Sequence, residues 1–237
     1  MGGEVESIGE AVSRAEARSA LAWWIEAGVD SLVQEAPRDW LKPAASPVRE
    51  DKPSSGVPAA PPAHETLEEF REWLATSDHL PMASRTARRV LPRGPDHAAV
   101  MLLADAPEDG SGPIGGEAWE LAKRMLAAIH IPADQAYAAA LSFFHAPGAR
   151  MSPAEREALG EIARRHVRLA APRRLILFGD GPSLALTGKR LAEARGHVHK
   201  VEGVRTVATF HPRHLVNRPL DKSLAWQDLL LLMEDEG

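Results

Sequence analysis

Short apolar runs alternate with amphipathic stretches from residue 65 to the end of the chain. The apolar runs cover residues 98–104, 136–142, 174–179 and 204–210. The run at 98–104 is continuous, as expected for a strand that is buried on both faces. Helical patterns occupy the segments between and around them, at 67–75, 117–130, 152–170, 182–195 and 221–234. Strands that alternate with helices predict an α/β fold of three αβα layers around a central, four-stranded, mostly parallel sheet.

The start of the helix at 152–170 has a specific local signal. Ser152 is a good N-cap residue, Pro153 suits the first helical position, and Glu155 can complete a capping box. This signal predicts that a helix starts here.

The first 64 residues differ in composition from the rest. Residues 7–35 are rich in Ala, Leu and Glu and predict a helix, with tryptophans at positions 23 and 24. Six prolines between residues 43 and 62 indicate a linker. We therefore expect a Trp-containing helical segment at 1–42, a Pro-rich linker at 43–64 and the α/β domain at 65–237. The N-terminal helix either packs back onto the domain or docks a protein partner through its tryptophans.

Charge is unevenly distributed along the chain. The formal net charge is −5, which by itself disfavours a nucleic-acid partner. Residues 1–70 carry 6 Lys/Arg against 13 Asp/Glu, whereas residues 173–218 carry 9 Lys/Arg against 3 Asp/Glu. The second region predicts either a basic face for phosphate contact or a merely solvated surface.

The chain has no cysteine, which excludes disulfides, cysteine zinc sites and a thiolate-held iron–sulfur cluster. No apolar run approaches the length of a membrane span, and the acidic N-terminus is unlike a signal peptide. We expect a cytoplasmic protein that has no membrane partner, metal or other cofactor.

Two loops that follow predicted strands carry chemically useful side chains. Asp105 begins a glycine-rich loop after the first strand, and His211 follows the last strand with Pro212 directly after it. Ligands of open α/β sheets bind at the carboxyl ends of the strands. The glycine-rich loop matches neither a dinucleotide fingerprint nor a phosphate loop.

The last loop and helix resemble the second signature of the uracil-DNA glycosylase superfamily, in its iron–sulfur branch. That signature reads H-P-S-x-L-L-R, then Pro, Lys and W-x-D-L, and it is matched in order by His211, Pro212, Leu215, Pro219, Lys222, Trp226, Asp228 and Leu229. Residues 104–107 are similar to the first signature, G-E-A-P-G, with Asp105 in the acidic position. The resemblance is collinear from about residue 91 to 233.

The resemblance implies a DNA repair glycosylase that hydrolyses the N-glycosidic bond of uracil or a related deaminated base. Asp105 would assist the attacking water and the sugar cation, and His211 would stabilise the leaving base. The substrate-binding positions would be Ala106, Pro107, Ile114 and Ala140. Leu215 would be the wedge in the base stack, and the other DNA contacts would be Arg213, His214, Arg218, Lys222 and Arg150.

The chain departs from the family at several of these positions. Phe144 occupies the position where the family has a cysteine of the iron–sulfur cluster. Ile114 occupies the position of an aromatic residue that stacks on the base, and Ala140 that of an Asn that reads uracil. A glycosylase fold that has lost catalysis and binds DNA or a protein in a repair complex is therefore the alternative. Asp105 could instead cap the glycine-rich turn, and His211 could be a structural hydrogen-bonding residue. Leu215 could instead belong to the core, and the role of Arg150 could be limited to an ion pair with Glu155 or Asp134.

Overall fold

The structure is a computed structural model, and it describes residues 18–19, 23, 65–83, 87–146 and 151–234. Contacts divide the chain into two units, Met1–Ser54 and Ser55–Gly237. In the first unit, Arg18, Ser19 and Trp23 are helical, and the Trp23 side chain is 66% exposed. The rest of the predicted segment 1–42 and all of the linker 43–64 lie outside the described residues.

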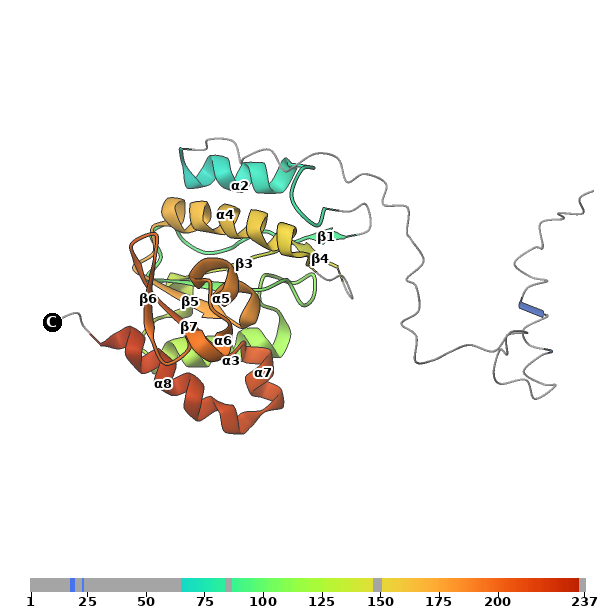
Figure 1. The fold of residues 1–237 in the computed structure, drawn as a ribbon. Coiled ribbons are helices and arrows are strands. Elements are labelled where there is room, and N and C mark those ends of the chain that lie inside the picture. The colour runs from blue at the N-terminus through green and yellow to red at the C-terminus, as the bar shows by residue number, and fades with distance from the viewer. Residues whose placement is uncertain (1–17, 20–22, 24–64, 84–86, 147–150, 235–237) are drawn as a thin grey trace, which may run out of the picture. The chain divides into compact units, whose positions relative to one another are not determined.

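The second unit is built around a five-stranded sheet in the order β3-β2-β5-β7-β6 (Figure 1). The first four strands are parallel to their neighbours, and β6 runs antiparallel to β7. A separate two-stranded antiparallel sheet pairs β1 with β4. The strands are β1 (Arg88–Arg89), β2 (Val100–Ala104), β3 (Ala136–Ala140), β4 (Phe144–His145), β5 (Arg174–Phe178), β6 (Val198–Val201) and β7 (Val204–Thr209).

Helices cover both faces of this sheet, and two core clusters separate the three layers (Figure 1). One cluster lies under α2 and α4, and the other lies under α3 and α8. The helices are α2 (Leu67–Thr76), α3 (Gly116–Ala128), α4 (Pro153–Ala170), α5 (Asp180–Thr187), α6 (Leu191–Ala194), α7 (Pro212–Asn217) and α8 (Lys222–Met233), with 3₁₀ turns at Ala133–Gln135 and Pro219–Asp221. The predicted α/β class and the mostly parallel central sheet are confirmed.

Three details of the sequence-based fold need correction. The sheet has five strands rather than four, because β6 forms a hairpin with β7 through Glu202 and Gly203, which both have positive φ. The single helix predicted at 182–195 is two helices, since Gly188 ends α5 in the left-handed conformation. The loop predicted after β7 is largely helical, because Pro212 is the first residue of α7.

Local sequence signals explain several element boundaries. The capping box predicted at Ser152 is present, with the Ser152 Oγ accepting from Glu155 N and Glu155 Oε2 accepting from Ser152 N. All residues of β2 and β3 are buried, as their continuous apolar runs require. Strand β3 is at the sheet edge, but Arg93 covers that edge through reciprocal backbone hydrogen bonds with Ala138.

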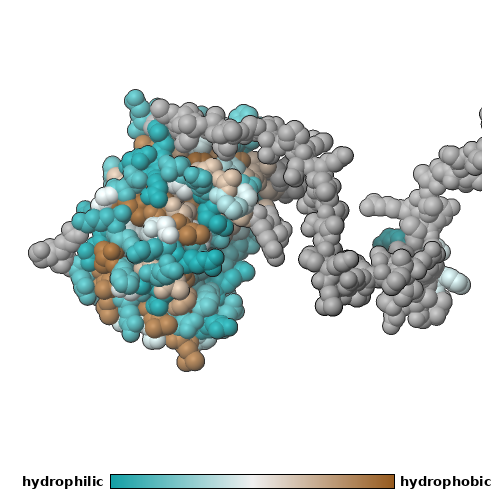
Figure 2. Space-filling model, in the orientation of Figure 1, coloured by the Kyte–Doolittle hydropathy of each residue, from teal (hydrophilic) through white to brown (hydrophobic). Residues whose placement is uncertain are grey.

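The surface seen in Figure 2 alternates between hydrophilic side chains and smaller apolar areas. Among the large apolar residues that the structure describes, Leu220 is the most exposed, at 90%, and it lies in the turn before α8. Leu224, Trp226 and Leu230 on α8 are each 37–40% exposed. No helix in the described part of the chain is long and apolar enough to cross a membrane.

Candidate active site

The two predicted catalytic residues follow strands that flank β5. Asp105 comes directly after β2, and His211 comes two residues after the end of β7. Because β5 separates these strands, their ends are about 10 Å apart at ordinary strand spacing. Both side chains approach the turn that follows β5. The fold therefore brings Asp105 and His211 to one edge of the sheet, where α/β proteins bind ligands.

The turn after β5 consists of Gly179, which is the N-cap of α5, and of Asp180 and Gly181, which begin that helix. Gly179 has φ +91° and donates its N–H to Thr209 O at 2.9 Å, which extends the pairing of β5 with β7. Asp180 Oδ1 accepts from Leu191 N at 2.8 Å. The Asp105 carboxylate occupies the space that a Cβ on Gly181 would need. A side chain at 181 would therefore displace the Asp105 carboxylate.

Asp105 is exposed to solvent, and its carboxylate also lies against the backbone at Gly181. Its main chain is held in the sheet, because Asp105 O accepts from Ser142 N at 2.9 Å. Burial raises the pKa of Asp105 above its usual range, the positive charge of Arg156 opposes this, and the negative charge of Asp180 adds to it. Asp105 is thus a carboxylate with an elevated proton affinity at the sheet edge.

His211 is the N-cap of α7, and this role determines which ring nitrogen carries the proton. Its Nδ1 accepts a hydrogen bond from Arg213 N at 3.2 Å. A neutral imidazole that accepts at Nδ1 has its proton on Nε2. Burial, assisted by the charge of Arg213, lowers the pKa of His211 to about 4. The ring also lies edge-on to Phe178, with centroids 5.9 Å apart. At neutral pH, His211 is therefore an uncharged hydrogen-bond donor through Nε2.

Glu108 is a site residue that the sequence did not indicate. Its Oε1 lies 2.7 Å from Arg213 Nε and 3.5 Å from His211 Nδ1, and its side chain is only 13% exposed. Burial raises the pKa of Glu108, and the positive charge and hydrogen bond of Arg213 oppose this. Glu108 and Arg213 are far apart in sequence, so only the fold shows that they pair.

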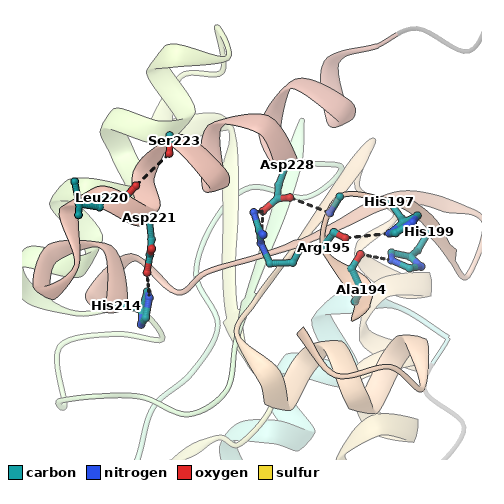
Figure 3. Close-up of polar contacts among 10 residues, drawn as sticks. Ala194, Arg195, His197, His199, His214, Leu220, Asp221, Ser223 and Asp228 are labelled. Carbon is teal, nitrogen blue, oxygen red and sulfur yellow. Dashed lines mark hydrogen bonds and ion pairs between the residues drawn. The ribbon is translucent and has the colours of Figure 1, made fainter. Parts of the chain in front are cut away.

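A second set of contacts fixes the segment that carries His211. Phe210 lies between two partners, with the His214 ring stacked on it at 4.7 Å and 12° and the Arg195 guanidinium 4.7 Å from its centroid. His214 Nε2 contacts Asp221 Oδ2 at 2.6 Å, and Arg195 binds Asp228 through Nε and Nη2 (Figure 3). Contacts on both sides of Phe210 therefore hold the backbone that leads into His211.

The glycine-rich loop after Asp105 is also well anchored. His145 Nδ1 donates to Pro107 O at 2.9 Å, and Asp109 Oδ1 accepts from both the N and the Oγ of Ser111. These hydrogen bonds with Ser111 lower the pKa of Asp109. Arg93 donates to Ile114 O at 3.3 Å. The loop is thus held on two sides and presents a defined surface next to the site.

A pocket of about 280 Å³ lies between this loop and α7. Its lining includes Glu108, Asp109, Glu117, Arg213 and Asn217. Three of these five side chains are acidic, and Arg213 is already paired with Glu108. The pocket is therefore more suited to neutral or cationic groups than to a phosphate.

The structure places the remaining predicted residues in different settings. Leu215 is only 1% exposed because α7 turns it into the interior, so the prediction that it is a wedge is wrong for this structure. Ile114 (0% exposed), Ala140 (2%) and Pro107 are buried, and Ala106 is half-buried, so the first three offer no accessible substrate contact.

The predicted DNA contacts also divide into two groups. His214 and Arg213 have protein partners, Asp221 and Glu108. Arg218 and Lys222 are exposed on either side of Leu220, whose exposure the sequence did not reveal. Arg150 lies outside the described residues. The exposed cationic and apolar groups of this region therefore include Arg218, Leu220 and Lys222, beside Arg213, whose side chain is 61% exposed but paired with Glu108.

In the described ranges, no group of three or more His, Asp or Glu side chains is arranged to hold a metal ion. No protein-family model matches the chain, and no curated protein matches it.

Proposed function

We propose that the chain is a DNA glycosylase that hydrolyses the N-glycosidic bond of uracil or a related deaminated base. One observation carries the proposal: a carboxylate and a neutral imidazole with its proton on Nε2 lie on either side of the Gly179–Gly181 turn. The collinear resemblance to glycosylase signatures places the same two residues, Asp105 and His211, in the catalytic positions.

The charges of the two groups fit this reaction. Cleavage of an N-glycosidic bond builds positive charge on the sugar and negative charge on the departing base. An ionised Asp105 stabilises the sugar cation and orients the attacking water. His211 donates Nε2–H to the base oxygen as that oxygen becomes anionic. Such preorganised electrostatic groups are usually the largest contribution to catalysis.

The low pKa of His211 makes it a neutral donor rather than a cation in the working pH range. A neutral imidazole keeps its Nε2 proton while it stabilises the developing charge. The backbone N–H of Arg213 supports this state because it occupies Nδ1. The positive charge of the Arg213 side chain, which Glu108 holds in place, also disfavours protonation of the ring. The site therefore favours hydrogen-bond stabilisation over full proton transfer to the base.

DNA would be contacted by the exposed turn before α8. Arg218 and Lys222 supply charge for phosphates, and Leu220 supplies an apolar tip in place of the buried Leu215. Flipping a base out of the stack costs a few kcal/mol, roughly, and an inserted apolar side chain offsets part of that cost. Leu220→Ala should weaken base release from duplex DNA more than from single-stranded DNA, while Leu224→Ala serves as the matched control.

The decisive experiment measures base release from an oligonucleotide with one uracil, single-stranded and opposite guanine, by alkaline cleavage of the abasic product. Wild-type protein should cleave, and Asp105→Asn and His211→Gln should each lose at least 100-fold in rate, in line with the usual size of such electrostatic contributions. Asp134→Asn and His197→Gln, which change exposed residues, are the matched controls. Equal rates in all five proteins would refute the assignment of these residues.

A second candidate is a glycosylase fold without catalysis that binds DNA or a protein partner. The burial of Ile114 and Ala140 favours it, because base discrimination needs accessible stacking and hydrogen-bonding groups. This candidate predicts salt-dependent DNA binding with no base release from uracil, hypoxanthine or xanthine substrates. Release of any of these bases, lost in Asp105→Asn, would exclude it.

A further inference from the structure

Two arginines beside the candidate active site have guanidinium groups that no protein group holds. Arg88 is exposed on β1, and Arg156 is half-buried in the first turn of α4. Among the residues that the structure describes, neither guanidinium has an acidic side chain within 4.0 Å or an acceptor within hydrogen-bond distance. Their N–H donors are therefore available to a ligand.

The pairing of β1 with β4 places Arg88 on the glycine-rich loop. Arg88 is opposite His145, and His145 Nδ1 donates to Pro107 O at 2.9 Å. The Arg88 guanidinium occupies the space that a Cβ on Gly110 would need. The next residue, Arg89, is turned the other way and binds two carbonyl oxygens at the end of α2. The exposed charge of Arg88 thus lies against the loop that carries the site.

Arg156 acts on the Asp105 carboxylate itself. Burial raises the pKa of Asp105, and the positive charge of Arg156 opposes this effect. Opposite charges act in this way over about 4–6 Å, so Arg156 lies beside the carboxylate without a direct ion pair. Arg156 is therefore close enough to reach the phosphate of a nucleotide whose sugar lies at Asp105.

The two arginines and the exposed turn before α8 lie on opposite sides of the central sheet (Figure 1). Strand β4, which pairs with β1, and helix α4 pack against one core cluster, whereas α8 packs against the other. Arg88 and Arg156 thus lie on one side of the candidate active site, and Arg218 and Lys222 lie on the other. A continuous phosphate backbone that crosses the site can contact both groups, whereas a single small anion cannot.

We propose that Arg88 and Arg156 bind phosphates of the DNA strand that carries the target base, and that this strand crosses the carboxyl edge of the sheet from α4 to α8. This path rests on the proposed glycosylase function, because it takes Asp105 as the point of base release. Arg156 binds the phosphate next to the released base, and Arg88 binds one further along. Guanidinium groups donate two parallel hydrogen bonds to phosphate oxygens. Such contacts fix the position of the strand without reading its sequence.

The test is the salt dependence of DNA binding by the full chain, measured by fluorescence anisotropy. The probe is a single-stranded oligonucleotide with one tetrahydrofuran abasic analogue, which a glycosylase cannot cleave. Each phosphate contact to a single strand contributes about 0.7 to the slope of log K against log salt concentration. Arg88→Gln and Arg156→Gln should therefore each lower the slope by about 0.7, and the double variant by about 1.4.

The matched control is Arg173→Gln, which changes an exposed arginine directly before β5, at the opposite edge of the sheet. It should leave the salt slope unchanged. A slope in the double variant equal to that of wild type, a slope in the control that falls as much as in Arg88→Gln, or no binding at low salt would overturn the proposal.

Two further measurements separate phosphate binding from a structural role. Arg88→Gln and Arg156→Gln should unfold at the wild-type temperature, since neither side chain has a protein hydrogen bond to lose, and a lower temperature would overturn the assignment of that residue. The acid limb of the pH–rate profile of base release should move to higher pH in Arg156→Gln but not in Arg88→Gln, because the charge of Arg156 lowers the pKa of Asp105.

The DNA surface and the glycosylase function fail in different ways. A reduced salt slope in the double variant, without base release from any substrate, would support the surface and refute the glycosylase function. Base release by the wild-type protein, with an unchanged salt slope in the double variant, would support the glycosylase function and refute the surface.

Discussion

The buried ion pair between Arg195 and Asp228 offers a quantitative test of what holds α8 and the His211 segment together. Asp228 is 1% exposed and accepts from Arg195 Nε at 3.1 Å, Arg195 Nη2 at 3.0 Å and Gly196 N at 3.0 Å (Figure 3). Arg195→Met removes two of these three partners and keeps much of the side-chain volume. It leaves a buried carboxylate with one backbone donor.

The expected cost follows from the desolvation of that carboxylate. Breaking a buried pair by removing one partner typically destabilises a protein by about 3–5 kcal/mol. Asp228→Leu should cost less, about 2 kcal/mol, because the Arg195 side chain is 18% exposed and its charge can turn to solvent. The double substitution removes both charges, so it should recover at least about 2 kcal/mol relative to Arg195→Met alone.

Urea unfolding followed by tryptophan fluorescence measures these free energies. The matched control is Lys123→Met, which breaks the exposed Glu120–Lys123 pair of 2.8 Å and should cost less than about 1 kcal/mol. The reasoning is refuted if Arg195→Met costs as little as this control. It is also refuted if the double variant is no more stable than Arg195→Met.

Three other predictions concern pH and close approach. The rate of base release should decrease as the pH falls through the raised pKa of Asp105, because the reaction needs the carboxylate. The rate should show no inflection near pH 6.5, because the pKa of His211 is about 4. A pH–rate profile checks both points. Gly181→Ala should reduce base release at least tenfold, because a Cβ at 181 displaces Asp105. Gly188→Ala is strained at φ +73° but meets no atom within 4 Å, so it should cost stability without lowering the rate of the folded protein. A rate unaffected at 181 contradicts this. Burial lowers the pKa of His166 to about 3, so the unfolded state binds more protons and stability falls as pH decreases from 6.5 toward 3. His166→Phe should reduce the change of the free energy of unfolding with pH by about 1.4 kcal/mol per pH unit between pH 4 and 6. Urea unfolding at several pH values measures this change, and an unchanged pH dependence would contradict the prediction.

The continuous apolar runs made the parallel strands predictable. Strands β2 and β3, and β5 after Arg174, are buried on both faces, so these sequences carry no charged interruption. Strand β6 escaped notice because its sequence, Val-His-Lys-Val, is mostly solvent-facing and lies at the sheet edge. The Glu202–Gly203 pair before Val204 was the local signal of a hairpin turn.

The candidate site was predictable only where local sequence determines position. Asp105 and His211 follow strand ends, and topology alone brings such residues to one edge. Leu215 was misjudged because a loop was expected after the last predicted strand, whereas Pro212 starts a helix that turns Leu215 inward. Glu108 could not be identified, because its partner Arg213 lies on a different element and no local pattern links the two.

The two edges of the central sheet have a consequence for self-association. An open strand edge is a template for pairing with a second chain, which can lead to aggregation. Backbone hydrogen bonds from Arg93 occupy the outer side of β3, and β6 presents the exposed Lys200 at the other edge. One edge is therefore already paired, and the other is guarded by charge against the addition of a further strand.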